Sequence, residues 1–384
     1  MIIGIDAHQL EGVRTGVGRY LYNLLKQWNT PDSYVKQKGI SFILYFKNSV
    51  PGDCAVFKAP LFVKRVLKTP FDIDSKFLYY NVSITKAARC NAIDVMFFPF
   101  YMLPLTYWGK AIVVVHDISY KVHPEWFSKG YGIPLRVLTY IALRRAYHIL
   151  TVSKFSAQQI LKYYPFVKSD HISTTPLGVD DVFMKTDYKK IADTVLKTYQ
   201  CKPFQYLLYV GSIFNRRHVN ELIQAFESLA PDYPSMKLLL IGRDLTHPAQ
   251  YIDQIIFRSN SALGREAILR KSFISDEDLV VLYRYAQAFV LLSEYEGFGL
   301  PPLEAMACGT PVISTHKTSL KETVDDAGII VADPNSIKEV SQALRSLLED
   351  KTLRKELIAR GKAHVTRFSW EATAKKTLEI ITRI

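Results

Sequence analysis

The chain has 384 residues, of which 48% are hydrophobic and 22% are charged, a composition that excludes disordered and fibrous proteins. At roughly 150 residues per domain, this length predicts two domains. The formal net charge of +13 is uneven, because residues 1–200 carry 26 basic and 14 acidic side chains whereas residues 201–384 carry 23 and 22. An anionic partner would therefore meet the first half of the chain.

The chain has few cysteines and no segment typical of export. Cys54, Cys90, Cys201 and Cys308 are too far apart for a metal knuckle or a redox pair, so we expect reduced structural thiols. The first residues, MIIGID, enter a strand pattern without a leader, and no apolar run approaches the roughly 18 residues of a membrane span. We expect a cytoplasmic protein that can also lie peripherally on the inner face of a membrane.

Short apolar runs alternate with helical patterns along both halves. The first half contains MIIGID (1–6), ISFILYF (40–46), DVMFF (94–98), AIVVV (111–115) and HILTV (148–152). The second half contains YLLYV (206–210), KLLLIG (237–242), AFVLL (288–292), TPVIS (310–314) and GIIV (328–331). Strands that are apolar throughout are typical of parallel sheets covered on both faces. The pattern predicts an α/β protein of two doubly wound, Rossmann-like domains.

The domain boundary is expected between Pro176 and Pro203, where charges and turn formers interrupt the strand pattern. We therefore predict an N-terminal domain over 1–180 and a C-terminal domain over 181–368. A final helix over 369–384 follows, with Ser369 as its N-cap.

One acidic triplet, Asp72-Ile73-Asp74, spells a DXD sequence that could ligate a divalent cation. It precedes a helical pattern and does not end a buried strand, so we expect capping instead. No metal site is predicted.

The most informative segment is SEYEGFGLPPLEAMACGTPVIS, residues 293–314. Glycines let a backbone approach a ligand closely, and the N–H groups that open the helix at Pro301 suit a diphosphate. A carboxylate beside them would accept hydrogen bonds from sugar or ribose hydroxyls. We expect Glu296 in the loop and Glu304 in the first helical turn. The alternative is an ordinary turn in which Glu304 only complements the helix dipole.

The spacing of Glu296 and Glu304, with GFGLP between them and EAMACGTPVI after, resembles the signature of the retaining GT-B glycosyltransferases of family 4, the glycosyl transferases group 1. The resemblance implies two domains facing a central cleft and a last helix that crosses back to the first domain. It implies that Glu296 acts in catalysis at the transferred sugar. It also assigns donor binding to Gly297, Phe298, Gly299, Leu300 and Glu304.

Two further segments of the second half are similar to the same family. In YVGSIFNRRHVNELIQAF (209–226), Arg216 and Arg217 stand where the family usually has Arg-Lys on the donor diphosphate, and Ser212 lies in the turn before them. Surface solvation of the arginine pair is the alternative. In ILRKSFISDEDLVVLY (268–283), the resemblance places Phe273 and Ile274 along the nucleobase, whereas Asp276 and Asp278 read as the negative start of a helix.

The first strand is followed by TGVGRY, which places Gly16 and Gly18 between that strand and the first helix. The full GxGxxG of nicotinamide-binding proteins is absent. This segment is similar to the family's first loop, which closes over the donor diphosphate. Arg19 either helps to bind the diphosphate, or is a solvated surface residue or a member of a structural ion pair.

The strand AIVVV ends in His116 and Asp117, and TVSKFS (151–156) contains Ser153. From the residues alone, a lone histidine at a strand end is more often structural, but the resemblance implies that His116 faces the transferred sugar. Asp117 orients the sugar ring or caps a turn. Ser153 lies near the cleft in the family, or is a helix N-cap.

The resemblance implies a metal-independent, retaining transfer of a hexose from a nucleoside diphosphate sugar, with UDP or GDP as the nucleotide. No cofactor is expected, and the acceptor would be a hydroxyl of a glycan or a lipid-linked saccharide. The alternative is a catalytically silent partner that binds sugar nucleotides for another transferase. No nucleic-acid reader motif is present. Two segments, 58–71 and 133–149, mix basic with large apolar side chains. This mixture predicts either binding to an anionic membrane surface or helices whose polar faces are simply solvated.

Overall fold

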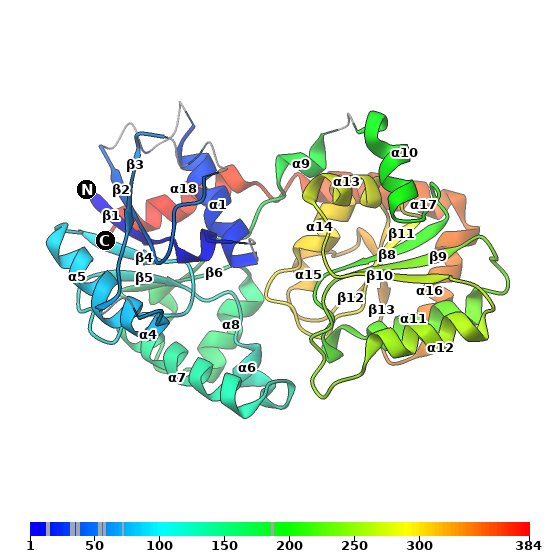
Figure 1. Ribbon diagram of the computed structural model, residues 1–384, viewed down its shortest axis with the longest axis horizontal. Helices are drawn as coiled ribbons and strands as arrows, with labels where there is room; N and C mark the ends of the chain where they lie inside the picture. Colours follow the sequence, from blue (N-terminus) through cyan, green and yellow to red (C-terminus); the bar gives the residue numbers. More distant parts are fainter. Residues whose placement is uncertain are drawn as a thin grey trace. The chain divides into compact units, whose positions relative to one another are not determined.

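A computed structural model describes residues 1–12, 16–30, 35, 39–52, 56, 59–70, 73–185 and 188–384. They form two compact units. The first unit comprises Met1–Pro124, Lys129–Gly178 and Ser369–Ile384, and the second comprises Glu125–Ser128 and Val179–Phe368. Each unit has a parallel sheet flanked by helices (Figure 1), so the predicted α/β class with two doubly wound domains is confirmed.

The sheet of the first unit has seven parallel strands in the order β3-β2-β1-β4-β5-β6-β7. The strands are β1 (Ile2–Asp6), β2 (Ser41–Phe46), β3 (Phe62–Val66), β4 (Val95–Phe98), β5 (Ala111–Val114), β6 (His148–Thr151) and β7 (Ile172–Thr174). The α-helices described in this unit are α1 (Gly16–Trp28), α4 (Lys76–Leu78), α5 (Thr85–Cys90), α6 (Ser119–Val122), α7 (Lys129–Arg145), α8 (Lys154–Tyr163) and α18 (Trp370–Thr382). The strand order reverses between β1 and β4, which is the switch point where ligands bind in such sheets.

The sheet of the second unit has six strands in the order β10-β9-β8-β11-β12-β13. They are β8 (Tyr206–Val210), β9 (Lys237–Ile241), β10 (Ile268–Lys271), β11 (Ala288–Leu291), β12 (Val312–Thr315) and β13 (Gly328–Val331). The helices are α9 (Asp181–Met184), α10 (Lys189–Thr198), α11 (Val219–Leu229), α12 (Ile252–Ala262), α13 (Asp276–Tyr285), α14 (Leu300–Ala307), α15 (Leu320–Thr323), α16 (Ile337–Glu349) and α17 (Lys351–Val365). Here the order reverses between β8 and β11.

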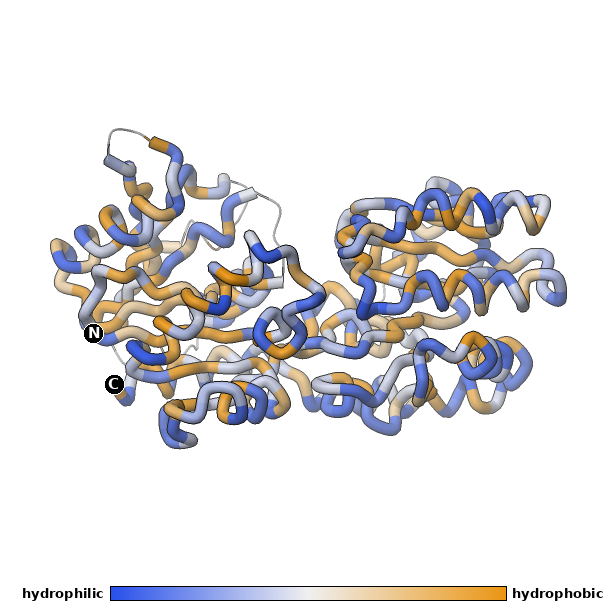
Figure 2. The backbone as a smooth tube through the Cα atoms, turned by 90° about the horizontal axis from the view of Figure 1, so that it is seen from below, coloured by the Kyte–Doolittle hydropathy of each residue, from blue (hydrophilic) through white to orange (hydrophobic). Residues whose placement is uncertain are grey.

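The predicted apolar runs all form strands, and hydrophobic residues dominate these strands in both units (Figure 2). Three further strands, β3, β7 and β10, were not predicted. All three lie at sheet edges, where fewer side chains need be apolar. Residues 62–66 are therefore an edge strand rather than part of a helix.

The last helix packs on the first unit (Figure 1), where α18 lies beside α1. Ser369 caps α18 as predicted, accepting from the Ala372 N–H. The buried Trp28 of α1 donates from its indole Nε1 to the Ala374 carbonyl at 3.0 Å and stacks on Phe42 with ring centroids 5.1 Å apart. These contacts join the two ends of the chain in one core.

Two predictions about local structure are wrong. Gly16 and Gly18 lie within α1 and not in a loop before it, because the helix already begins at Gly16. Asp74 does not cap α4. Its carboxylate pairs with Lys47, and Ser75 caps the helix by accepting from the Leu78 N–H, since a hydroxyl directly before the helix reaches that donor.

Several other expectations can be compared with the described residues. Cys90, Cys201 and Cys308 are free thiols, and the last two are buried. Cys54, Asp72 and the ends of segment 58–71 lie outside the described residues. Within the described part of the chain, no helix combines the length and the hydrophobicity needed to cross a membrane.

We predict that Trp28→Ala lowers the free energy of unfolding of the first unit by about 3–5 kcal/mol, because it removes a buried aromatic side chain that is 2% exposed. Urea denaturation followed by circular dichroism measures this loss. Trp108→Ala is the matched control, because Trp108 is 78% exposed and its replacement should cost less than about 1 kcal/mol. Equal losses in the two variants would contradict the described packing.

Candidate functional site

The candidate site lies at the switch point of the second unit, where the loops after β8 and β11 meet. The Glu294 N–H, in the loop after β11, donates to the Arg216 carbonyl, in the loop after β8, at 2.8 Å. Arg216 and Arg217 belong to a single turn of 3₁₀ helix, Asn215–Arg217, that precedes α11. Parallel strands deliver their following loops to the same sheet edge, so this position follows from the topology.

The centre of the site is an ion pair between Arg217 and Glu296. Arg217 Nε donates to Glu296 Oε1 at 2.7 Å and Nη2 donates to Oε2 at 2.9 Å, a bidentate arrangement. The two side chains are 12% and 11% exposed. Arg217 Nη1 also donates to the Ser212 carbonyl at 2.9 Å, which the Tyr209 hydroxyl approaches at 3.1 Å. The surface-solvation alternative is therefore wrong for Arg217.

A glycine makes room for this guanidinium. Gly211 has a φ of +137°, and a Cβ atom added there would lie 2.5 Å from Arg217 Nη1. Both the backbone conformation and the close approach therefore require glycine.

The electrostatics of the pair favour its charged form. Burial works against ionisation of Glu296, but the charge of Arg217 and its hydrogen bonds hold the pKa of this carboxyl below its usual value. Burial likewise opposes the charge on Arg217, yet the field of Glu296 raises its pKa. The site thus keeps one carboxylate and one guanidinium charged at neutral pH.

Arg216 takes a different position from its neighbour. Its Nε donates to the Tyr295 carbonyl at 3.3 Å, and its guanidinium carbon lies 4.2 Å from the centroid of the Phe214 ring. Such a cation–π contact orients the side chain without neutralising it.

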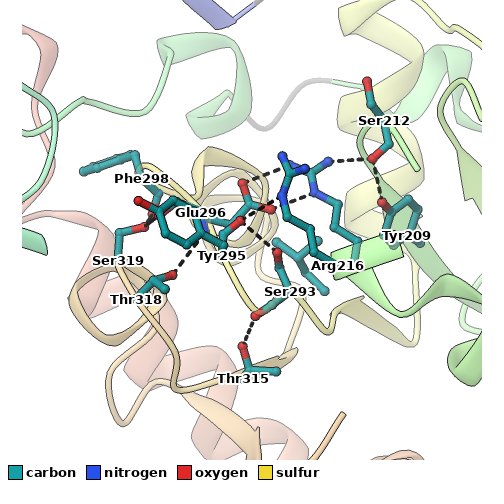
Figure 3. A network of polar contacts seen from close by, with 12 residues as sticks. Tyr209, Ser212, Arg216, Ser293, Tyr295, Glu296, Phe298, Thr315, Thr318 and Ser319 are labelled. Carbon is teal, nitrogen blue, oxygen red and sulfur yellow. Dashed lines mark hydrogen bonds and ion pairs between the residues drawn. The ribbon is translucent and has the colours of Figure 1, made fainter. Parts of the chain in front are cut away.

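A set of hydroxyl groups holds the loop that carries Glu296 (Figure 3). The Glu296 N–H donates to Thr318 Oγ1 at 3.1 Å, and Ser319 Oγ donates to the carbonyls of Glu296 and Phe298 at 2.7 and 2.9 Å. The sequence reasoning missed Thr318 and Ser319. Their signal was the hydroxyl-rich segment STHKTS (314–319), which begins at the last residue of the run at 310–314.

The helix that follows the loop begins one residue before the predicted start at Pro301. Gly299, with a φ of +102°, is the N-cap of α14, and Leu300, Pro301 and Pro302 form its start. Pro301 and Pro302 have no N–H, so at this helix start only the amides beside them, such as that of Leu300, can attract an anion. Gly297 lies in the loop, and Phe298 is buried with its ring 5.9 Å from that of Phe368.

Glu304 lies in the second turn of α14 and not in the first, because the helix already starts at Leu300. Its side chain is buried, and Oε2 accepts from the Tyr283 hydroxyl at 3.1 Å. Tyr283, on α13, is a further residue that the sequence reasoning did not select. Its signal is weak, since an apolar helix face ordinarily contains tyrosine.

The nucleobase candidates lie in the turn before α13. Phe273 is 71% exposed and Ile274 is buried. Ser275 caps the helix, and Asp276 and Asp278 fall in its first turn, as expected for negative residues at a helix start.

The first unit brings His116 next to α1. His116 Nε2 donates to the Pro99 carbonyl at 3.0 Å, and its ring lies edge-on to Tyr20 with centroids 5.2 Å apart. Burial lowers the pKa of His116 and keeps it neutral, so Nδ1 is an acceptor. Asp117 Oδ1 accepts from the Ser119 N–H at 2.7 Å, which is the turn-capping role.

The remaining first-unit candidates lie at helix starts. Ser153 caps α8 by accepting from the Ser156 N–H at 3.0 Å, and Ser156 in turn donates to the His116 carbonyl at 2.9 Å. Gly16 begins α1, and Gly18 and Arg19 lie in its first turns. Among the described residues, no group of three or more His, Cys, Asp or Glu side chains is placed to hold a metal ion.

The second of two Rossmann-like units thus brings a carboxylate, two arginines and a glycine-capped helix to its switch point, a set of groups that suits an anionic ligand with hydroxyl groups. The comparisons identify the class. The family model for glycosyl transferases group 1 matches residues 201–364. O-antigen chain mannosyltransferase B of Escherichia coli is 32% identical over 373 residues, covering 95% of this chain and 95% of that protein. The chain belongs to the glycosyl transferases group 1.

Two other similarities are more distant. Serotype-specific mannosyltransferase WbdA of Escherichia coli is 28% identical over 278 residues, which are 72% of this chain and 34% of that protein. The crystal structure of Anabaena Alr3699/HepE in complex with UDP-glucose superimposes with a TM-score of 0.75 at 17% identity, covering 100% of this chain and 99% of that one. This structure supports the GT-B fold.

We predict that Arg217→Met lowers the free energy of unfolding of the second unit by about 3–5 kcal/mol, because Glu296 is left buried without its partner. Without Arg217, burial raises the folded-state pKa of Glu296 above its unfolded value. A carboxyl with a raised pKa loses stability as the pH rises, so the deficit should be larger at pH 7.5 than at pH 5.

Urea unfolding of wild type and variant at these two pH values measures the effect. The double variant Arg217→Met/Glu296→Gln is the control, and it should recover part of the loss and remove its pH dependence. A deficit of the same size at both pH values would show that Glu296 does not carry the charge described.

Proposed function

We propose that this glycosyltransferase moves a hexose from a nucleoside diphosphate sugar to a hydroxyl of a glycan or lipid-linked saccharide, with retention at the anomeric carbon and without a metal ion. The observation that carries the proposal is the second-unit site, in which a charged carboxylate, Glu296, lies beside Arg216 and next to the start of α14. A sugar hydroxyl suits the carboxylate, and a diphosphate suits the cation and the helix amides.

The chemistry follows from these charges. The bond between the anomeric carbon and the diphosphate breaks, and negative charge builds on the leaving phosphate. Arg216 and the N–H groups around Gly299 stabilise that charge electrostatically. The acceptor oxygen bonds to the anomeric carbon from the face that the phosphate leaves, and its proton passes to the departing phosphate oxygen. Electrostatic stabilisation by protein groups would make a bound metal unnecessary.

Other residues are assigned to the ends of the donor. Glu304, held by Tyr283, accepts hydrogen bonds from the ribose hydroxyls, and Phe273 with Ile274 lies along the base. Arg217 holds Glu296, and Ser212 supports Arg217 through its carbonyl.

In the first unit, neutral His116 offers Nδ1 to a sugar hydroxyl, and Gly16 and Gly18 offer helix-start amides to the diphosphate. The weaker candidates in the same unit are Arg19, Asp117 and Ser153, which we assign to the acceptor or to the rest of the sugar site.

Mannose is the proposed sugar, because the relatives named above are mannosyltransferases. GDP and UDP are the proposed nucleotides, and a bound UDP-sugar in HepE supports a nucleotide-sugar donor for this fold. We place the reaction in the cytoplasm, in the synthesis of a surface polysaccharide.

We predict that one series among UDP-, GDP- and ADP-sugars raises the melting temperature by several degrees without added metal, since a ligand at about 100 times its Kd adds about 2.7 kcal/mol. Glu304→Ala should lose this shift, whereas the exposed Glu356→Ala should keep it. Differential scanning fluorimetry measures both. NMR of the product's anomeric centre tests retention.

An unchanged melting temperature with every nucleotide sugar would overturn the proposed donor site. Donor binding without transfer to any saccharide acceptor would favour the catalytically silent partner.

We also propose that the first unit docks on an anionic membrane. Three apolar residues of α7, Ile133, Val137 and Tyr140, are exposed and repeat at the spacing of one helix face. Arg144 continues this face, and its guanidinium carbon lies 5.6 Å from the centroid of the Tyr140 ring. In another part of the same unit, the edge strand β3 exposes Val63 and Val66 among basic residues. Apolar side chains flanked by cations suit the headgroup region.

Binding to vesicles that contain anionic phosphatidylglycerol should be strong at low salt and weaken several-fold at high salt, because the attraction is partly electrostatic. Charge reversal at Lys64, Arg65 and Lys68 should weaken it further. Reversal of three exposed lysines of the second unit, Lys338, Lys351 and Lys355, is the control and should change little. Co-sedimentation measures the bound fraction, and equal effects of the two triple variants would refute docking through the first unit.

A further inference from the structure

The first unit contains a buried polar cluster at its own switch point, outside the residues considered so far. Asp6 is the last residue of β1, and His8 opens the short 3₁₀ helix His8–Leu10 directly after it. The strand order reverses between β1 and β4. In the second unit the corresponding position, after β8, carries the arginines of the candidate site. Topology therefore places Asp6 and His8 where this fold binds ligands.

The Asp6 carboxylate lies among hydrogen-bond donors. His8 Nδ1 donates to Oδ1 at 2.8 Å, and the Tyr80 hydroxyl donates to Oδ2 at 2.7 Å. The His8 N–H approaches Oδ1 at 3.4 Å, and the Tyr79 hydroxyl lies 3.2 Å from Oδ1 and 3.0 Å from the Tyr45 carbonyl. Tyr79 and Tyr80 begin a stretch of π-helix, Tyr79–Ile84. Such stretches are rare and occur frequently at functional sites, because they redirect side chains that a regular helix would point elsewhere.

The carboxylate at the centre of the cluster is charged although it is only 1% exposed. Burial opposes its ionisation, but the charge of His8 and the hydrogen bonds of His8 and Tyr80 lower the pKa of Asp6 below its usual value. A buried charge is costly unless it is fully paired, and a hydrophobic core does not need one. The cluster therefore calls for a role beyond packing.

The hydrogen bonds orient the imidazole. Because a charged carboxylate can only accept, Nδ1 of His8 carries the proton that points to Asp6, and Nε2 is the ring nitrogen that faces away from the carboxylate. The Gln9 side-chain amide lies 3.0 Å from that nitrogen. Of the four clustered side chains, His8 keeps the largest exposed fraction, 9%, so its ring is the part of the cluster nearest to solvent.

We propose that His8 and Gln9 bind the saccharide acceptor, with an acceptor hydroxyl hydrogen-bonded to His8 Nε2 in place of the Gln9 amide, and the Gln9 amide donating to the oxygen of that hydroxyl. Asp6 and Tyr80 are positioning residues that fix the ring and its tautomer. This inference rests on the proposed glycosyl transfer and names the protein groups that hold its acceptor.

The test uses the full chain, the donor sugar found by the thermal-shift panel, and octyl α-mannobioside as the acceptor probe. His8→Asn keeps a donor near the position of Nδ1 but removes the hydrogen-bonding group at Nε2. It should lower kcat/KM for the acceptor about tenfold or more, while the Kd of the nucleotide and the slow hydrolysis of the donor without acceptor stay unchanged. His8→Gln, which returns an amide near Nε2, should recover part of the loss.

Tyr80→Phe provides a second variant should His8→Asn fold poorly, and it should raise the acceptor KM several-fold with nucleotide binding intact. The exposed His171→Asn is the control and should behave as wild type. Unchanged acceptor kinetics in both His8→Asn and Tyr80→Phe would overturn the inference. So would a loss of nucleotide binding and melting temperature that parallels the loss of transfer, because that marks a role in folding. A wild-type chain that transfers no sugar would instead refute the proposed function itself.

Discussion

The second unit is organised around the ion pair of Arg217 and Glu296. Its two members are 79 residues apart in the sequence, and only the adjacency of β8 and β11 brings them together. Each is nearly buried, so neither charge would be tolerated without the other. The glycine at 211 and the carbonyl of Ser212 serve the guanidinium, and the hydroxyls of Thr318 and Ser319 hold the loop of the carboxylate.

The two units apply the same topological rule with different chemistry. In both sheets the strand order reverses next to the first strand of the unit, and in both the end of that strand and the loop after it carry polar or charged side chains. After β8 these are arginines, which suit a phosphate. After β1 they are Asp6 and His8, which suit a hydroxyl. This difference matches the proposed anionic donor and the proposed acceptor hydroxyl.

How far the sequence predicted this molecule depends on the kind of physical signal involved. Central strands such as β8 and β11 are buried on both faces, so their apolar runs were plain in the sequence. Edge strands such as β3, with the residues FVKRV, meet solvent on one side and carry charges, and they were missed. The cap at Ser369 is a local signal and was predicted correctly. The helix start at Gly16 was not, because glycine also suits the loop that was expected there.

The candidate site shows the same limit. A motif can select Glu296 and Arg217 separately, but no local pattern states that they bind each other, since that contact depends on strand order. The hydrogen bond between Tyr283 and Glu304 joins α13 to α14 and is equally invisible in the sequence.

The structure gives a reason for arginine, and not lysine, at position 217. A lysine there would be a compact point charge free to turn toward a phosphate, whereas the planar guanidinium is engaged on one edge by Glu296 and on another by the Ser212 carbonyl. The pair therefore fixes the carboxylate in place, and this fixed geometry distinguishes the arginine at 217 from the lysine usual in the family.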